Sequence, residues 1–146
     1  GLGFEGWIDR LIESAGYQGH VIVATDGLNP KRMNHEGKEI VDPHAWHSPQ
    51  NAHVYVSNIS KALIAALPDH KDVIVARTKA YQEKITELDQ EMHEAFKNIP
   101  LEKRKVITAH DGFGYLGQCE SRQAAAFGAG AEQKLRQPDW LCRCVL

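Results

Sequence analysis

Asp42-Pro43-His44-Ala45-Trp46 presents a histidine on a short turn, immediately before a helix start at Ser48-Pro49. A second histidine turn, Thr108-Ala109-His110-Asp111-Gly112, follows a long segment with helical periodicity. Serine is a common N-cap, and proline is favoured at the first helical position. Neutral imidazole is the commonest nitrogen ligand of divalent metals, so two histidines held at the ends of stiff elements suit a metal site. The pair predicts metal binding, which neither histidine would predict alone.

Two helices are expected between these turns. The first runs from Ser48 to about Ala66, and Pro68 breaks it. The second begins near Asp69 and stops at Pro100. Its residues recur at steps of three and four: Ile74, Arg77, Tyr81, Ile85, Leu88, Met92, Phe96 and Ile99. A helix of this length spans about 45 Å at 1.5 Å per residue. That exceeds what a compact domain of this size needs and favours a helix that links two bodies.

Shorter elements flank the two helices. Periodic apolar residues predict a helix over residues 4–12, and the β-branched run at residues 21–24 predicts a buried strand. Residues 27–39 are polar and rich in turn formers, which indicates a surface loop. Brief strands are expected at residues 40–41 and 106–108. Helices mixed with short strands predict an α/β fold.

Composition narrows the function classes. The 146 residues are 42% hydrophobic and 25% charged, with a formal net charge of -2 and no basic block, which argues against a nucleic-acid partner. No apolar run approaches the roughly 18 residues of a spanning helix, and the N-terminus lacks signal-peptide order. Cys119, Cys142 and Cys144 are an odd set in the last 28 residues, and we interpret them as incidental.

The sequence resembles the metal-binding solute-binding proteins of bacterial zinc and manganese ABC importers, a family that includes streptococcal-type adhesin lipoproteins. The resemblance covers about residues 1–118, with the segments in the family's order. The stretches that carry it are Gly1-Leu2-Gly3-Phe4-Glu5-Gly6-Trp7, the Asp42–Trp46 turn, Ser48-Pro49-Gln50-Asn51-Ala52, the long helix with Tyr81, Ile99-Pro100-Leu101-Glu102-Lys103-Arg104 and residues 108–115.

The resemblance implies a partial two-lobe metal-receptor fold with a long linking helix. Residues 1–66 would form part of an N-terminal α/β lobe, 67–99 the linking helix and 100–118 the start of a C-terminal lobe, while 119–146 would be a tail unlike the family. In the family, four side chains hold the metal between the lobes, two from each lobe. His44 would be the second ligand and His110 the third.

The function implied is binding and transport of a divalent metal, without catalysis. Histidine ligands favour Zn²⁺ over the alternative, Mn²⁺. The partner would be the membrane permease of the importer, and the location periplasmic or extracytoplasmic, with a lipoprotein anchor compatible with the family.

The other two ligands of the family lie before Gly1 and far downstream, so the chain is expected to be truncated at both ends. Two alternatives therefore stay open. In the first alternative, the chain is a self-associating fragment without a working metal site, which pairs as a homodimer through uncovered apolar surface. Alternatively, His44, His110 and Asp111 hold zinc and a water in a hydrolase, although an organised base motif such as His-Glu-x-x-His is absent from the sequence.

Overall fold

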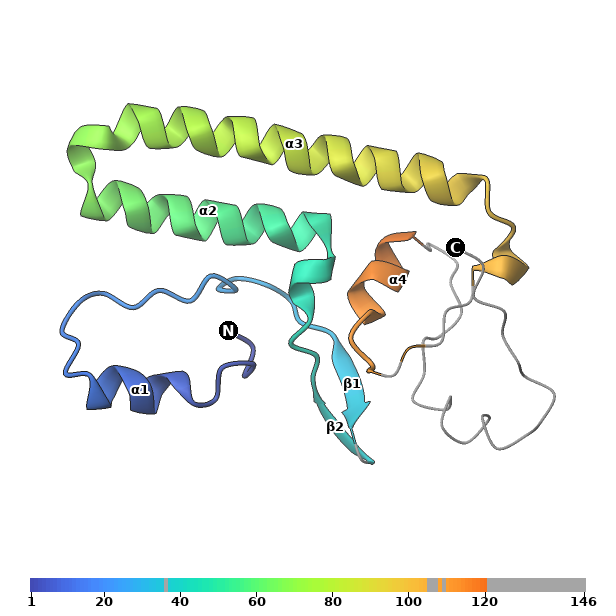
Figure 1. Cartoon of the computed structure of the whole chain (residues 1–146), viewed down its shortest axis with the longest axis horizontal. Coiled ribbons are helices and arrows are strands. Elements are labelled where there is room, and N and C mark those ends of the chain that lie inside the picture. Colours follow the sequence, from blue (N-terminus) through green and yellow to red (C-terminus); the bar gives the residue numbers. More distant parts are fainter. Residues whose placement is uncertain (36, 105–107, 109, 121–146) are drawn as a thin grey trace.

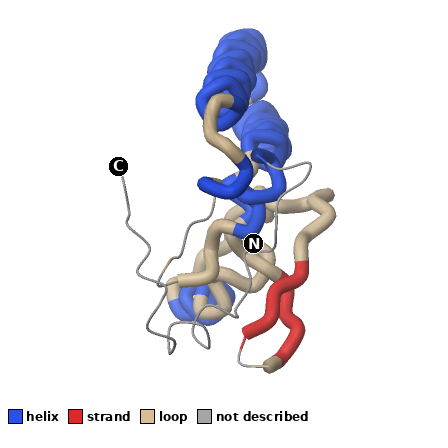
Figure 2. Tube along the Cα trace, turned by 90° about the vertical axis from the view of Figure 1, so that its right-hand side faces the viewer, coloured by secondary structure: helices blue, strands red, loops and turns tan. Residues whose placement is uncertain are grey.

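A computed structural model describes residues 1–35, 37–104, 108 and 110–120 of the chain. Its largest feature is an antiparallel pair of helices, α2 (Pro49–Ala66) and α3 (Lys71–Lys97), which run side by side (Figure 1). A two-stranded ribbon lies near the start of α2, with α4 (Gly114–Glu120) beside it. Viewed end-on, the paired helices are stacked above the ribbon and loops (Figure 2).

The start of α2 is fixed by local chemistry. The Ser48 side chain accepts a hydrogen bond from the backbone N–H of Asn51 at 3.3 Å, and Pro49 occupies the first helical turn. The side-chain amide of Asn51 donates a second hydrogen bond, to the backbone carbonyl of Ala45 at 3.1 Å. This bond connects the helix to the short 3-10 turn Ala45–His47 before it. The predicted N-cap is confirmed, and the histidine turn is attached firmly to α2.

The long helix α3 is also confirmed, although only part of its apolar stripe is buried. It follows a 3-10 turn at Pro68–His70 and has 27 residues, or about 40 Å of length. Ile85 is buried against α2, whereas Tyr81 and Leu88 are 58% and 52% exposed. The expected apolar stripe is therefore only partly covered by the rest of the described chain.

The predicted surface loop at residues 27–39 is wrong for its second half. Strands β1 (Arg32–His35) and β2 (Lys38–Val41) form an antiparallel ribbon, and β2 contains the strand expected at residues 40–41. Gly37 has a φ of 79°, a conformation that glycine adopts without a Cβ clash, and its N–H donates to the Asn34 side chain at 2.9 Å. Mostly exposed, polar strands give no alternation of apolar residues, so the pattern resembled a loop.

The strand expected at residues 21–24 is not formed. This segment is irregular, and Val21, Ile22 and Val23 are each about half exposed. A strand needs a neighbour to accept its backbone hydrogen bonds, and none of the described strands lies beside it. The strand expected at residues 106–108 lies largely outside the described residues, as does the tail from residue 121.

The described part of the chain has a small core. Its buried apolar side chains are Ala45, Ile85 and Tyr115, and the last of these lies beside the histidine turns. The remaining N-terminal helix, α1 (Ile8–Ser14), buries none of its residues. None of the helices described is long and apolar enough to cross a bilayer. The best-packed region is therefore where the start of α2, the ribbon and α4 meet.

Candidate metal centre

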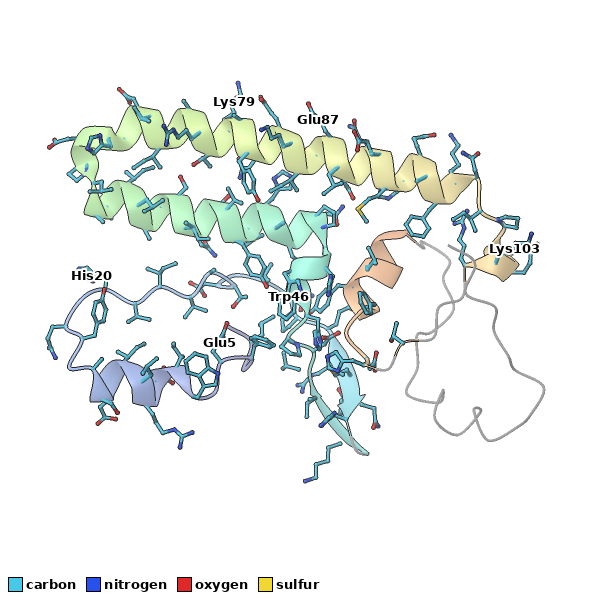
Figure 3. All side chains as sticks on the ribbon, viewed as in Figure 1. Glu5, His20, Trp46, Lys79, Glu87 and Lys103 are labelled. Carbon is cyan, nitrogen blue, oxygen red and sulfur yellow. The ribbon has the colours of Figure 1, made fainter. Side chains whose placement is uncertain are left out.

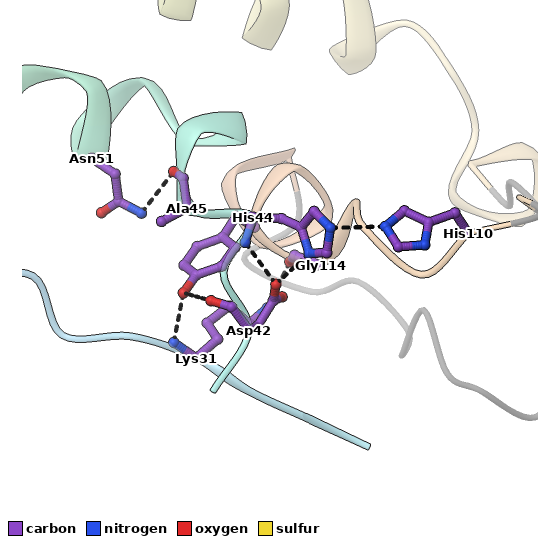
Figure 4. A network of polar contacts seen from close by, with 8 residues as sticks. Lys31, Asp42, His44, Ala45, Asn51, His110 and Gly114 are labelled. Carbon is purple, nitrogen blue, oxygen red and sulfur yellow. Dashed lines mark hydrogen bonds and ion pairs between the residues drawn. The ribbon is translucent and has the colours of Figure 1, made fainter. Parts of the chain in front are cut away.

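The two predicted histidines lie side by side, with their rings in an edge-on arrangement at an interplanar angle of 67°. His44 stands just before the 3-10 turn that leads into α2 and is 7% exposed, whereas His110 comes from the segment after α3 and is exposed. Their Nε2 atoms are 2.8 Å apart. Figure 4 marks this contact with a dashed line. Because α2 and α3 are antiparallel, the end of α3 lies at the same end of the helix pair as the start of α2. The two histidine turns can therefore meet there.

The nitrogen separation reflects a hydrogen bond between the imidazoles. Two nitrogens bound to one tetrahedral zinc at about 2.0–2.1 Å would lie about 3.3 Å apart. The observed 2.8 Å is a normal length for a hydrogen bond in which one ring donates and the other accepts. An opening of about 0.5 Å would fit both rings to one zinc ion, which is a small movement for an exposed side chain such as His110.

Asp42 orients His44. Its Oδ1 lies 2.7 Å from the His44 Nδ1 and also accepts the backbone N–H of His44 at 2.9 Å. Asp42 is 4% exposed, so the carboxylate is sheltered from water. A carboxylate that accepts Nδ1–H leaves the Nε2 lone pair free for a metal, which is the usual support of a metal-binding histidine. This role of Asp42 was not predicted from the sequence, although its spacing of two from His44 is that of an Asx turn.

The ribbon and α4 are joined by Tyr115. Its hydroxyl donates to the Asp42 carbonyl at 2.9 Å and accepts the Lys31 backbone N–H at 2.9 Å. The Lys31 ammonium donates to the carbonyl of Gly114 at 2.6 Å. Burial raises the pKa of Tyr115, so the phenol stays protonated and able to donate at neutral pH. Through its hydroxyl, Tyr115 thus joins the segment after His110 to the segment before His44.

We expect Tyr115→Phe to lower the free energy of unfolding by about 1–3 kcal/mol, because the buried Asp42 carbonyl and Lys31 N–H both lose their partner. Urea denaturation measures this loss. Tyr17→Phe is the matched control, since Tyr17 is 54% exposed and its hydroxyl makes only a 3.5 Å contact with His20. Equal stability of the two variants would contradict this role of the Tyr115 hydroxyl.

Aromatic side chains shelter the histidine pair on one side. Trp46 lies where the start of α2 meets the N-terminal segment (Figure 3), with its ring 5.3 Å from that of His44 and 5.1 Å from that of Phe4. His47 lies against Phe113 at 4.9 Å rather than joining the pair, and burial lowers its pKa. His47 is therefore neutral near pH 7 and adds no positive charge to the site.

Gly112 allows the two rings to approach. A Cβ at this position would lie 3.0 Å from the His44 Cδ2 and 3.1 Å from the His110 Cδ2. Both distances are shorter than ordinary van der Waals contact, so any side chain here would press on both imidazoles.

The described residues supply two nitrogen donors to this centre. No group of three or more histidine, cysteine, aspartate or glutamate side chains suited to a metal occurs among them. A structural zinc site has four ligands, so the pair fits half of such a set. Within the same part of the chain, no hydrogen bond joins Asp111 to His110. The side chain of Cys119, together with Cys142 and Cys144, lies outside the described residues.

Comparison with known proteins identifies the family. The family model of ZnuA, the periplasmic component A of a zinc-uptake complex, matches residues 1–136. The chain belongs to the ZnuA family. This confirms the resemblance found in the sequence, and the match extends past residue 118, where that resemblance was taken to end.

Several relatives of this ZnuA-family chain are metal receptors. It is 37% identical over 121 residues to the manganese ABC transporter substrate-binding lipoprotein PsaA of Streptococcus pneumoniae, covering 80% of this chain and 38% of that protein. It is also 37% identical over 120 residues to the iron-binding protein YfeA of Yersinia pestis, covering 81% and 38%. The chain thus spans well under half the length of the curated relatives it matches.

Solved structures confirm the fold. A crystal structure of ZnuA superposes with a TM-score of 0.74 at 29% identity, covering 82% of this chain and 45% of that one. A zinc-bound deletion mutant of ZnuA gives 0.77 at 26% identity, covering 92% and 54%. The expected α/β class and partial metal-receptor fold are therefore correct, and the family is one of transport receptors rather than enzymes.

Proposed function

We propose that this chain is part of the solute-binding receptor of an ABC importer and captures a divalent transition metal, with His44 and His110 as two of its ligands. The observation that carries the proposal is the 2.8 Å approach of their Nε2 atoms, which come from turns that are far apart in sequence, one before α2 and one after α3. The buried Asp42 adds support because it holds the His44 ring with Nε2 toward His110. The remaining ligands would come from outside the described residues.

Zinc is the favoured metal and manganese the alternative. Imidazole nitrogens suit zinc, whereas manganese prefers carboxylate, carbonyl and water oxygens. The printed names of the relatives include manganese, iron and zinc proteins, so the preference rests on the two nitrogen donors of this chain.

We propose the same arrangement of segments for this chain as in the two-lobe receptors that it resembles. Residues 1–66 belong to an N-terminal lobe, residues 67–99 form the linking helix and residues 100–118 begin the second lobe. The receptor works outside the cytoplasmic membrane, anchored as a lipoprotein or free in the periplasm, and delivers its metal to a membrane permease. Support comes from relatives named as substrate-binding lipoproteins of ABC transporters.

Isothermal titration of the metal-stripped chain with zinc and then with manganese tests the proposal. We expect one saturable site per chain, with tighter binding of zinc because both identified donors are nitrogen atoms. Heats no larger than those of dilution for both metals would contradict metal capture by this chain. Saturable binding with manganese the tighter ligand would contradict the zinc preference alone.

The exposed apolar side chains support a second proposal, self-association into a homodimer. Phe4, Trp7 and Leu11 near the N-terminus are each more than half exposed, as are Tyr81 and Leu88 on α3. Apolar surface of this extent favours burial against a partner. Light scattering after size exclusion should give twice the 16.3 kDa mass of one chain at high concentration. A concentration-independent monomer would contradict self-association and leave the metal proposal intact.

A further inference from the structure

The seam between α2 and α3 is joined by polar side chains. Four side-chain pairs bridge the two helices: Gln50 with Asp89 at 2.8 Å, His53 with Thr86 at 3.3 Å, Ser57 with Gln82 at 3.0 Å and Ser60 with Thr78 at 2.8 Å. We call these eight residues the polar ladder. Helix pairs usually bury apolar residues at their contact, so a continuous row of polar bridges needs an explanation.

The polar ladder fits one alignment of the helices. Its rungs follow one another at steps of three and four residues on both helices, in opposite directions, as an antiparallel pair requires. The donor–acceptor distance of a hydrogen bond can vary by only a few tenths of an ångström, whereas apolar contact is non-directional. Sliding α3 by one turn, about 5.4 Å, would break all four pairs. Because the rungs recur about once per turn, three of them could form again with the next partner, but the buried Ser60 would lose Thr78 and meet an apolar part of α3.

The alignment of the helices bears on where the two histidine turns stand. His44 is linked to the start of α2 through the 3-10 turn Ala45–His47, and His110 follows the end of α3 in sequence, at the same end of the antiparallel pair. The first rung, Gln50 with Asp89, lies closest to that end. A slip of one turn would exceed the opening of about 0.5 Å that two ring nitrogens at 2.8 Å need to take one zinc ion.

We propose that the polar ladder fixes the register of α2 against α3 and so positions His44 and His110 to hold one metal ion. The second half of this proposal rests on the proposed function, while the first half concerns the helices alone. Polar groups in helix interfaces are known to specify register at a cost in stability, and this is the role assigned to the polar ladder. Ser60, 8% exposed, is its most buried member. The eight residues are positioning residues and do not themselves contact the metal.

The test replaces rungs on α3 by apolar side chains of similar shape, in the triple variant Thr78→Val, Gln82→Leu, Thr86→Val. A matched control, Thr78→Ser with Thr86→Ser, keeps both hydroxyls. A second disrupting variant, Ser57→Ala with Ser60→Ala, removes the α2 side of two rungs with a strong helix former. Circular dichroism checks that each variant is helical.

Two measurements separate the two halves of the proposal. Spin labels at exposed positions, introduced as Ala65→Cys and Glu91→Cys after the three native cysteines are changed to serine, report the alignment of the helices without any metal. We expect a narrow distance distribution in the spin-labelled chain with an intact polar ladder, called the parent, and in the control with Thr78→Ser and Thr86→Ser. In the disrupting variants it should broaden or move by about 5 Å, one helical turn. Zinc titration should show affinity at least about tenfold weaker in the disrupting variants only, in line with losses at groups that orient metal ligands.

The outcomes are distinct. An unchanged, narrow distance distribution in both disrupting variants would overturn the register role, whatever the metal binding. A displaced distribution with unchanged zinc affinity would overturn the positioning of the histidines. If the parent binds no zinc, the proposed function fails, and the spin-label distances still decide whether the polar ladder fixes the register.

Discussion

Replacing His44 with alanine should weaken zinc binding by more than about a hundredfold. Removing an outer hydrogen-bond partner of a metal ligand already costs roughly 10- to 100-fold, and loss of the ligand itself must cost more. His110→Ala should have a similar effect, since in the proposed site each of the two neighbouring Nε2 atoms would donate to the same ion. The double variant should be little weaker than either single variant, because one ion cannot be held well by either ring alone.

Titration with a competing fluorescent chelator measures these affinities. His20→Ala and His35→Ala are matched controls, because both histidines are exposed and neither belongs to the proposed metal site. They should bind zinc as the parent does. A loss in the controls as large as in His44→Ala would show that zinc is held by surface histidines and would contradict the proposed centre.

The parts of the fold that could be predicted from sequence are those with local causes. The start of α2 depends on the Ser48 side chain and Pro49, which act within one turn. The end of the long helix is similar, since it closes just before Pro100. Such signals act over a few residues and need no tertiary partner.

Two errors have non-local causes. The β-branched run at Val21–Val23 is irregular because strand formation depends on a neighbouring strand, which propensity does not supply. The ribbon β1–β2 was missed because its residues are mostly exposed, so no burial pattern marks them. The burial of α3 could not be predicted either, because helical periodicity shows that a stripe exists but not which neighbour covers it.

The sequence singled out the two histidines that lie together, but not the residues that support them. His44 and His110 were recognisable from their turns and from the family resemblance. The contacts from Asp42 and Tyr115 depend on how the ribbon base lies against α4: Asp42 N–H donates to the Lys31 carbonyl at 2.9 Å, which places these two residues side by side. This arrangement arises only when segments far apart in sequence have packed.

Asp42→Asn should weaken zinc binding about 10- to 100-fold while leaving the chain folded. Asparagine keeps an oxygen that can accept the His44 backbone N–H at the position of the present 2.9 Å bond. It loses the negative charge that holds Nδ1–H and strengthens Nε2 as a donor to the metal. The loss should appear in zinc affinity and much less in the urea midpoint, because the packing around Tyr115 uses the backbone carbonyl of Asp42, which the substitution preserves.

Asp111→Asn is the matched control, since it removes the same charge next to the other histidine. Asp42 contacts the His44 ring, whereas no hydrogen bond between the described atoms joins Asp111 to the His110 ring. If orientation of the ring is what matters, Asp42→Asn should weaken zinc binding and Asp111→Asn should change it less than about threefold, as expected of a loosely coupled surface charge. Equal losses in both variants would mean that the carboxylates act only through their overall charge. No loss in Asp42→Asn would mean that the aspartate-histidine contact does not support the metal site.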